Sequence, residues 1–143
     1  MPSPPWFVYE RSAPKGFARS FDRAFGKGDD FEIAFLEPVS EAIPDCVEVL
    51  QILGNAYTRS GLYEKGLSID RRLTAICPGD DVAHYNLACS LALLGRKDEA
   101  FESLARSLDL GYRDLHAMVK DKDLESLRTD PRFVQILRSM IRR

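Results

Sequence analysis

The chain carries few of the residues from which catalytic and metal sites are built, with two histidines and three cysteines among 143 residues. His84 and His116 lie far apart in the sequence, and neither stands at a metal-ligand spacing from a cysteine. Cys89 has no general base beside it in the pattern of an activated nucleophile. Cys46, Cys77 and Cys89 are instead typical of small apolar residues that fill a helical interior. We therefore expect no catalytic residue, no metal, no cofactor and no enzymatic activity.

Two acidic pairs, Asp29-Asp30 and Asp80-Asp81, have the look of paired carboxylates for acid–base chemistry. Each pair stands where a helix is expected to begin, and there a carboxylate binds exposed backbone N–H groups and suits the helix dipole. Gly26-Lys27-Gly28 is too short for a phosphate-binding loop and lacks the Ser or Thr that such a loop places after its Lys. These residues indicate helix caps and turns.

Composition and charge are those of an ordinary globular chain. Apolar residues make up 45% and charged residues 29%, and the formal net charge is −2, which favours neither nucleic acid nor an anionic membrane as a partner. An odd number of widely spaced cysteines indicates a reducing compartment. The sequence has no apolar run long enough for a transmembrane helix and no signal-peptide pattern at its start. We expect a cytoplasmic protein without nucleic-acid or membrane partners.

The elements that position these residues are predicted to be helical hairpins. Tyr85–Leu110 predicts two helices joined by a glycine turn, because apolar residues recur at helical spacing on each side of the turn. The same pattern occurs earlier in the chain, where Leu53-Gly54 aligns with Leu87-Ala88 and Gly66 aligns with Ala100. We call the spacing from Gly54 to Ala88 the repeat period. Small residues at these positions would let the two helices of each hairpin approach closely.

A helical hairpin that repeats with a period of about 34 residues resembles the tetratricopeptide repeat (TPR) family. The residues that match the family pattern are Leu53-Gly54, Tyr57, Gly66 and Pro78 in one copy and Leu87-Ala88 and Ala100 in the next. Asp70 departs from it, because the family usually has a large apolar residue there. The string Asp130-Pro131-Arg132-Phe133 resembles the start of a final helix found in many bacterial members, which caps the open end of the stack.

The resemblance implies an all-α domain in which antiparallel helical hairpins stack as a short right-handed superhelix with a C-terminal capping helix. We expect an extended Pro-rich arm over residues 1–15 and a single TPR domain over residues 16–143. The domain divides into a degenerate repeat (16–44), two clear repeats (45–78 and 79–112) and capping helices (113–143). The segment that begins at Arg113 starts like another first helix but looks too short to complete one.

The degenerate repeat carries two apolar stripes at helical spacing. The stripes consist of Phe17, Phe21, Ala24 and Phe25, and of Phe31, Ala34, Phe35, Val39 and Ala42. We expect a kink or break near Pro38, because a proline removes one helix hydrogen bond at a cost of roughly 3 kcal/mol. In the arm, Trp6-Phe7-Val8-Tyr9 would be costly to leave in water and is expected to dock on this chain or on a partner.

In TPR folds the first helix of each hairpin lines a concave groove where ligands bind. The resemblance therefore implies partner-binding residues on two helices: Gln51, Asn55, Thr58 and Arg59 on the first, and Tyr85, Cys89, Ala92 and Leu93 on the second. Amide groups of Gln51 and Asn55 could hold a peptide backbone, but Gln51 and Cys89 lack the positive charge used by members that grip a carboxylate. The alternative that these are ordinary solvent-facing positions remains open.

The expected function is a non-enzymatic protein–protein interaction module, a TPR adaptor or scaffold in a bacterial cytoplasm, with a peptide or partner helix in its concave groove. Two alternatives remain open. One is a self-assembling structural protein, a homo-oligomer joined through Phe17, Phe21 and Phe25. The other is a chaperone-like accessory subunit that shields an apolar segment of a client.

Overall fold

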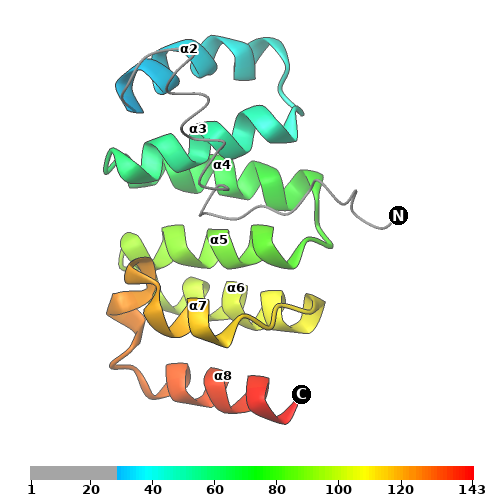
Figure 1. The fold of residues 1–143 in the computed structure, drawn as a ribbon, viewed down its shortest axis with the longest axis vertical. Coiled ribbons are helices and arrows are strands. Elements are labelled where there is room, and N and C mark those ends of the chain that lie inside the picture. Colours follow the sequence, from blue (N-terminus) through cyan, green and yellow to red (C-terminus); the bar gives the residue numbers. More distant parts are fainter. Residues whose placement is uncertain (1–28) are drawn as a thin grey trace. The chain divides into compact units, whose positions relative to one another are not determined.

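The computed structural model describes residues 29–143, and every regular element among them is a helix (Figure 1). In chain order these are α2 (Asp29–Ala42), α3 (Val47–Arg59), α4 (Tyr63–Ile76), α5 (Asp81–Leu93), α6 (Lys97–Leu110), α7 (Leu115–Lys120), the 3-10 helix η1 (Lys122–Leu127) and α8 (Pro131–Arg142). The predicted all-α class is confirmed. The expected arm over residues 1–15 and the apolar stripe from Phe17 to Phe25 lie outside the described residues.

The helix boundaries recur with the same repeat period as the sequence pattern. α3 and α5 begin at Val47 and Asp81, and α4 and α6 begin at Tyr63 and Lys97. α2 begins one period before α4, while α7 and α8 begin one period after α5 and α6. By this period α2 takes the place of the second helix of a hairpin. The expectation that the segment after Arg113 is too short is corrected, because α7 and η1 together span the full length of a first helix.

The described residues divide into two compact units, one that ends at Ile76 and one from Cys77 to Arg143. In the first unit, α2 packs against α3 and α3 against α4. The core between these helices is made by Leu36, Leu50, Leu53, Tyr57, Ile69 and Leu73. Leu36 is the fully buried contribution of α2 to this core, and the partly buried Ile33 packs against it.

α3 and α4 approach each other closely at Gly54 and Gly66. A Cβ added to Gly54 would lie 3.0 Å from Cγ2 of Ile69, and one added to Gly66 would lie 3.2 Å from Oγ1 of Thr58. Such distances leave no room for a larger side chain without displacing a neighbour. The close approach predicted from the small residues of this hairpin is confirmed.

α2 differs from its prediction in two ways. The helix continues through Pro38 without a break. Residues Ala34 and Pro38 are both exposed, so the Ala34 carbonyl that loses its helix partner can bind water instead. The stripe predicted to be buried is also wrong in part, because Phe31 and Phe35 are 41% and 46% exposed. The residue that α2 buries most fully against α3 is Leu36.

In the second unit, α5 packs against α6, η1 against α5, and α8 against α6. Ala88 and Ala100 are completely buried, as expected for the two small residues of this hairpin. The cap predicted at Asp80 is also confirmed: its carboxylate accepts hydrogen bonds from the N–H groups of Val82 and Ala83. Among residues 29–143, no helix combines the length and the apolar character needed to cross a membrane.

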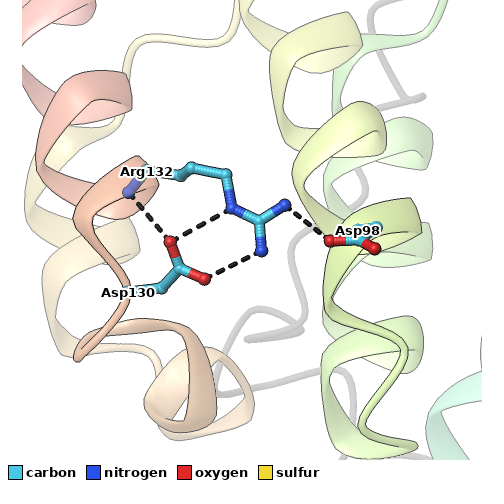
Figure 2. A network of polar contacts seen from close by, with 3 residues as sticks. All are labelled: Asp98, Asp130 and Arg132. Atoms are coloured by element: carbon cyan, nitrogen blue, oxygen red, sulfur yellow. Dashed lines mark hydrogen bonds and ion pairs between the residues drawn. The ribbon is translucent and has the colours of Figure 1, made fainter.

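Arg132 connects the start of α8 to the start of α6 (Figure 2). Asp130 is the predicted N-cap of α8, and its carboxylate accepts from the backbone N–H of Arg132 at 3.0 Å and from the guanidinium at 2.8 Å. The same guanidinium donates to Asp98 at 2.6 Å and lies 4.3 Å from the ring centroid of Phe101. Phe133 is buried one residue further on. The Asp-Pro-Arg-Phe string therefore both starts α8 and attaches it to α6.

Candidate functional site

The predicted binding residues of α3 lie at the edge of the first unit's core. Gln51 and Asn55 are half-buried, one helical turn apart, and neither is without an interaction partner in the structure. Thr58 is half-buried, and its hydroxyl donates to the Gly54 carbonyl at 3.1 Å. Since this bond stays within the helix, Thr58 takes no part in recognition through its hydroxyl unless the bond is exchanged. Gln51 and Asn55 carry amide groups that are likewise already engaged in interactions within the chain.

Arg59 is held by two acidic residues of α2. Its Nε donates to Asp29 at 2.8 Å, and Nη2 donates to Glu32 at 2.8 Å. The Arg59 side chain is still 51% exposed. A guanidinium already paired with two carboxylates has little capacity left for a third one. Arg59 is therefore an internal ion-pair partner of α2 rather than a cationic grip for a carboxylate.

A second polar network joins α2 to the other helices of this unit. The Tyr57 hydroxyl donates to Glu37 at 2.6 Å, and the Lys65 ammonium donates to the same carboxylate oxygen at 3.0 Å. Hydrogen bonds from Tyr57 and then Lys65 hold the pKa of Glu37 below its ordinary value. Burial and the bond to Glu37 raise the pKa of Tyr57. The network joins Glu37 of α2 to Tyr57 of α3 and Lys65 of α4, and so helps to hold α2 on these helices.

The predicted binding residues of α5 are buried inside the second unit. Tyr85 is 4% exposed, and Cys89 is completely buried. Ala92 is also buried, and only Leu93 is partly accessible. The prediction that Tyr85 and Cys89 line an accessible surface is therefore corrected. The physical reason is that Tyr112, Asp121 and η1 cover this face of α5, where the sequence suggested a segment too short to complete a first helix.

Contacts with three later segments cover the α5 face. The Tyr85 ring stacks on Tyr112 with a centroid separation of 4.4 Å. The Tyr85 hydroxyl donates to Asp121 at 2.8 Å, and the Cys89 thiol donates to the same carboxylate at 3.6 Å. Further along, the Ser126 hydroxyl donates to the Ala92 carbonyl at 3.1 Å. Burial raises the pKa of Tyr85, so its hydroxyl remains a donor to Asp121 at any ordinary pH.

Cys89, Asp121 and Asp123 bring three potential metal-ligand atoms within 4.8 Å of one another. Their chemistry is explained without an ion. The Asp121 carboxylate accepts from Tyr85, from Cys89 and from the backbone N–H of Asp123. A metal ion would bind Cys89 only as the thiolate, and it would have to displace these hydrogen bonds to Asp121. The set therefore fits a hydrogen-bonded junction between α5 and η1.

The remaining polar surface feature of this unit lies on α8. A hollow of about 410 Å³ is lined by Gln135, Arg138, Ser139, Arg142 and Arg143. Arg143 also binds Asp109 at 2.9 Å. All the lining residues belong to one helix and its end, so the hollow is the space between neighbouring side chains on a helix surface. It does not bring together residues from different elements.

Two residues of the α5 junction were not predicted, namely Tyr112 and Asp121. Tyr112 follows the glycine that ends α6, and Asp121 stands where α7 gives way to η1. Neither position has a local signal for a contact with Tyr85. The repeat period gives one indication of the contact with Asp121. The repeat equivalent of Tyr85 is residue 119, and Asp121 stands only two residues after residue 119.

No protein-family model matches the chain. The chain is similar to a chloroplastic protein from Arabidopsis thaliana, with 30% identity over 88 residues. The match covers 59% of this chain and 26% of that protein, so the chain spans about a quarter of its relative's length.

Proposed function

We propose that the chain is a non-enzymatic protein–protein interaction module of the TPR type, an adaptor or scaffold. The observation that carries this proposal is the recurrence of helix boundaries at one fixed repeat period, from α2 to α8. Arrays of helical hairpins use extended surfaces built from equivalent helices to bind other proteins. Most of the polar groups described above serve to cap a helix or to hold two helices together.

The binding surface in this proposal is the α3 face that carries Gln51 and Asn55. An amide group both donates and accepts, so two amides one turn apart can pair with the backbone of an extended peptide or the polar side of a partner helix. The burial of Tyr85 and Cys89 removes the corresponding part of α5 from this surface. Affinity would come from shape and hydrogen bonding, with no reaction on the partner.

The cytoplasm of a bacterium is the proposed compartment. Cys46, Cys77 and Cys89 are all free thiols, which suits a reducing environment. A net charge of −2 gives no reason to expect nucleic acid or an anionic membrane as the partner.

An affinity capture from native lysate with quantitative mass spectrometry tests this function. Full-length chain is compared with the double variant Gln51→Ala and Asn55→Ala, and with the control Arg106→Ala on the exposed side of α6. The proposal expects a protein that is captured by the full-length chain and by the control but lost with the double variant. Equal capture by all three chains would contradict the α3 face as the binding surface.

Self-assembly is a second candidate, and the exposed apolar residues of α2 and of the turn that follows it favour it. Phe31, Phe35 and Ile43 are 41%, 46% and 54% exposed. In this alternative a second copy covers them. It expects a dimer mass in sedimentation equilibrium that the variant Phe35→Ser reduces to a monomer, whereas a monomer at all concentrations would exclude it.

A further inference from the structure

The exposed side of α8 combines apolar and cationic side chains. On the other side of this helix Phe133 and Met140 are buried, and α8 packs against α6. Val134, Arg138 and Ile141 are all exposed, and their spacing places them on one helix face. Ile141 is 73% exposed, more than any other large apolar residue among residues 29–143. With Val134, which is 45% exposed, it forms an apolar ridge that loses the free energy its burial would provide.

The charge of α8 and its end has one sign. Residues 131–143 contain four arginines and no acidic residue. Arg132 and Arg143 already bind aspartates of the same unit. Within residues 29–143, Arg138 and Arg142 form no ion pair, and they stand one helical turn apart at exposed positions. We call Val134, Arg138, Ile141 and Arg142 the outer face of α8.

The helix dipole and the capping of a stack account for only part of this pattern. Arg142 lies in the last turn of α8, where a cation is favourable near the carboxyl end of the helix dipole. Arg138 lies a full turn earlier, and the apolar Val134 and Ile141 gain nothing from the dipole. A helix that only covers the end of a stack needs a polar outer surface. The apolar ridge on the outer face does not serve that purpose.

We propose that the outer face of α8 binds an acidic amphipathic helix of a partner protein. The ridge from Val134 to Ile141 extends about 10 Å along the helix axis, so it can fill the groove between side chains of a facing helix. Acidic side chains beside that groove would pair with Arg138 and Arg142, and one guanidinium can bind a carboxylate through two N–H groups at once. Burial of the ridge would provide affinity, and charge would select the partner.

A protein helix fits the outer face better than a membrane or a nucleic acid. A helix that lies in a membrane interface inserts its broad apolar side, but the side of α8 that carries Phe133 and Met140 is already buried. A nucleic acid presents phosphates to several cations at once, and its backbone offers no apolar surface to Ile141. The outer face shares no residue with the α3 face of the proposed function, so either proposal can fail without the other.

A displayed library of random peptides, each of about four helical turns, tests this proposal on the full-length chain. Selections are run in parallel on the unaltered chain, on Ile141→Ser, and on the double variant Arg138→Glu with Arg142→Glu. The control is the double variant Arg106→Glu with Lys120→Glu, which makes the same charge change at exposed positions of α6 and α7. Circular dichroism should be the same for all four chains, because every altered side chain is exposed.

The unaltered chain and the control are expected to enrich acidic peptides whose apolar residues recur at helical spacing. The Arg138→Glu and Arg142→Glu variant should instead enrich basic peptides with the same apolar pattern. A synthetic copy of the most enriched acidic peptide should bind Ile141→Ser roughly tenfold more weakly than the unaltered chain in fluorescence anisotropy, since the substitution removes the most exposed part of the ridge.

Enrichment of the same peptides on all four chains, enrichment without a charge bias, or no enrichment at all would overturn the proposal. Binding to phosphatidylserine vesicles that is lost in the Arg138→Glu and Arg142→Glu variant, without any enriched peptide, would overturn it in favour of a membrane surface. A dimer mass that Ile141→Ser converts to a monomer would overturn it in favour of a second copy of this chain on the outer face.

Discussion

The Tyr85 hydroxyl donates a 2.8 Å hydrogen bond to the Asp121 carboxylate, 36 residues further along the chain. This bond joins the middle of α5 to the point where α7 gives way to η1. Because Cys89 and the backbone of Asp123 bond to the same carboxylate, Asp121 organises the whole junction. A face predicted to receive a partner is thereby occupied by the chain itself.

Replacing Tyr85 with Phe should destabilise the second unit. The variant keeps the ring that stacks on Tyr112 but removes the donor to Asp121, and a hydrogen bond to a charged group contributes roughly 1.5–3 kcal/mol. Urea melts should show a loss of about this size. Tyr63→Phe, at a half-buried tyrosine at the start of α4, is the matched control and should change the free energy of unfolding little. A loss no larger than the control's would show that the bond adds nothing to stability.

Divalent metals should not stabilise the protein through Cys89, Asp121 and Asp123. Their oxygen and sulfur atoms are close enough for a metal, but Asp121 already accepts several hydrogen bonds. The melting temperature is expected to stay constant on addition of Zn²⁺ or Mn²⁺ at concentrations well above that of the protein. A rise that disappears in the Asp121→Asn variant would contradict the description of this cluster as a hydrogen-bonded junction.

Enlarging the small residues inside the second hairpin should overpack it. Ala88 and Ala100 are completely buried, so Ala88→Leu or Ala100→Leu should each cost roughly 1–3 kcal/mol of unfolding free energy. Ala105→Leu is the control, because Ala105 is exposed on the same helix as Ala100. Urea melts provide the comparison. If all three variants unfolded at the same midpoint, the packing of α5 on α6 would have to be different.

Asp130 should make the protein sensitive to acid. Hydrogen bonds from Arg132 lower the pKa of Asp130 from 3.8 to about 2. A carboxyl whose pKa is lowered on folding contributes stability that is complete above its ordinary pKa and is lost as the pH falls toward its folded value. The contribution should therefore disappear between about pH 4 and pH 2.

Thermal melts of Asp130→Asn across this pH range should show a shallower decline than melts of the unaltered chain. Arg132→Gln should flatten the curve in the same way, because it removes the main cause of the lowered pKa. The double variant should add little to either single change. Parallel declines in all four chains would assign the acid sensitivity to other groups.

Local sequence signals were sufficient where one residue type fixes the backbone. Asp80 and Asp130 each cap a helix, as expected from their positions at helix starts. A capping carboxylate binds only the backbone N–H groups two or three residues later, so the signal for it is local in the sequence. The small residues Gly54 and Gly66 predicted a close approach for the same reason, since the constraint acts within one hairpin.

The predictions that were wrong concern residues whose burial depends on contacts between different helices. Tyr85 and Cys89 were expected at the surface because the segment after Arg113 looked too short to be a first helix. This segment changes from an α-helix to a 3-10 helix at Asp121, so its sequence does not show its full helical length. Phe31 and Phe35 looked like core residues because the apolar stripe of α2 does not reveal which neighbour covers it. Leu36 is the residue of α2 that is buried in the core, and only the packing of α2 on α3 shows which side of the helix is covered.

The most direct test of the proposed function is a photo-crosslinking experiment at Asn55. A photoreactive amino acid replaces Asn55 in the full-length chain, and a second chain carries it at Arg106 on the exposed side of α6. After irradiation in native lysate, the account predicts a discrete protein adduct from position 55 that is absent from position 106. The same adducts from both positions, or an adduct from position 106 alone, would contradict the proposal that a partner binds the α3 face.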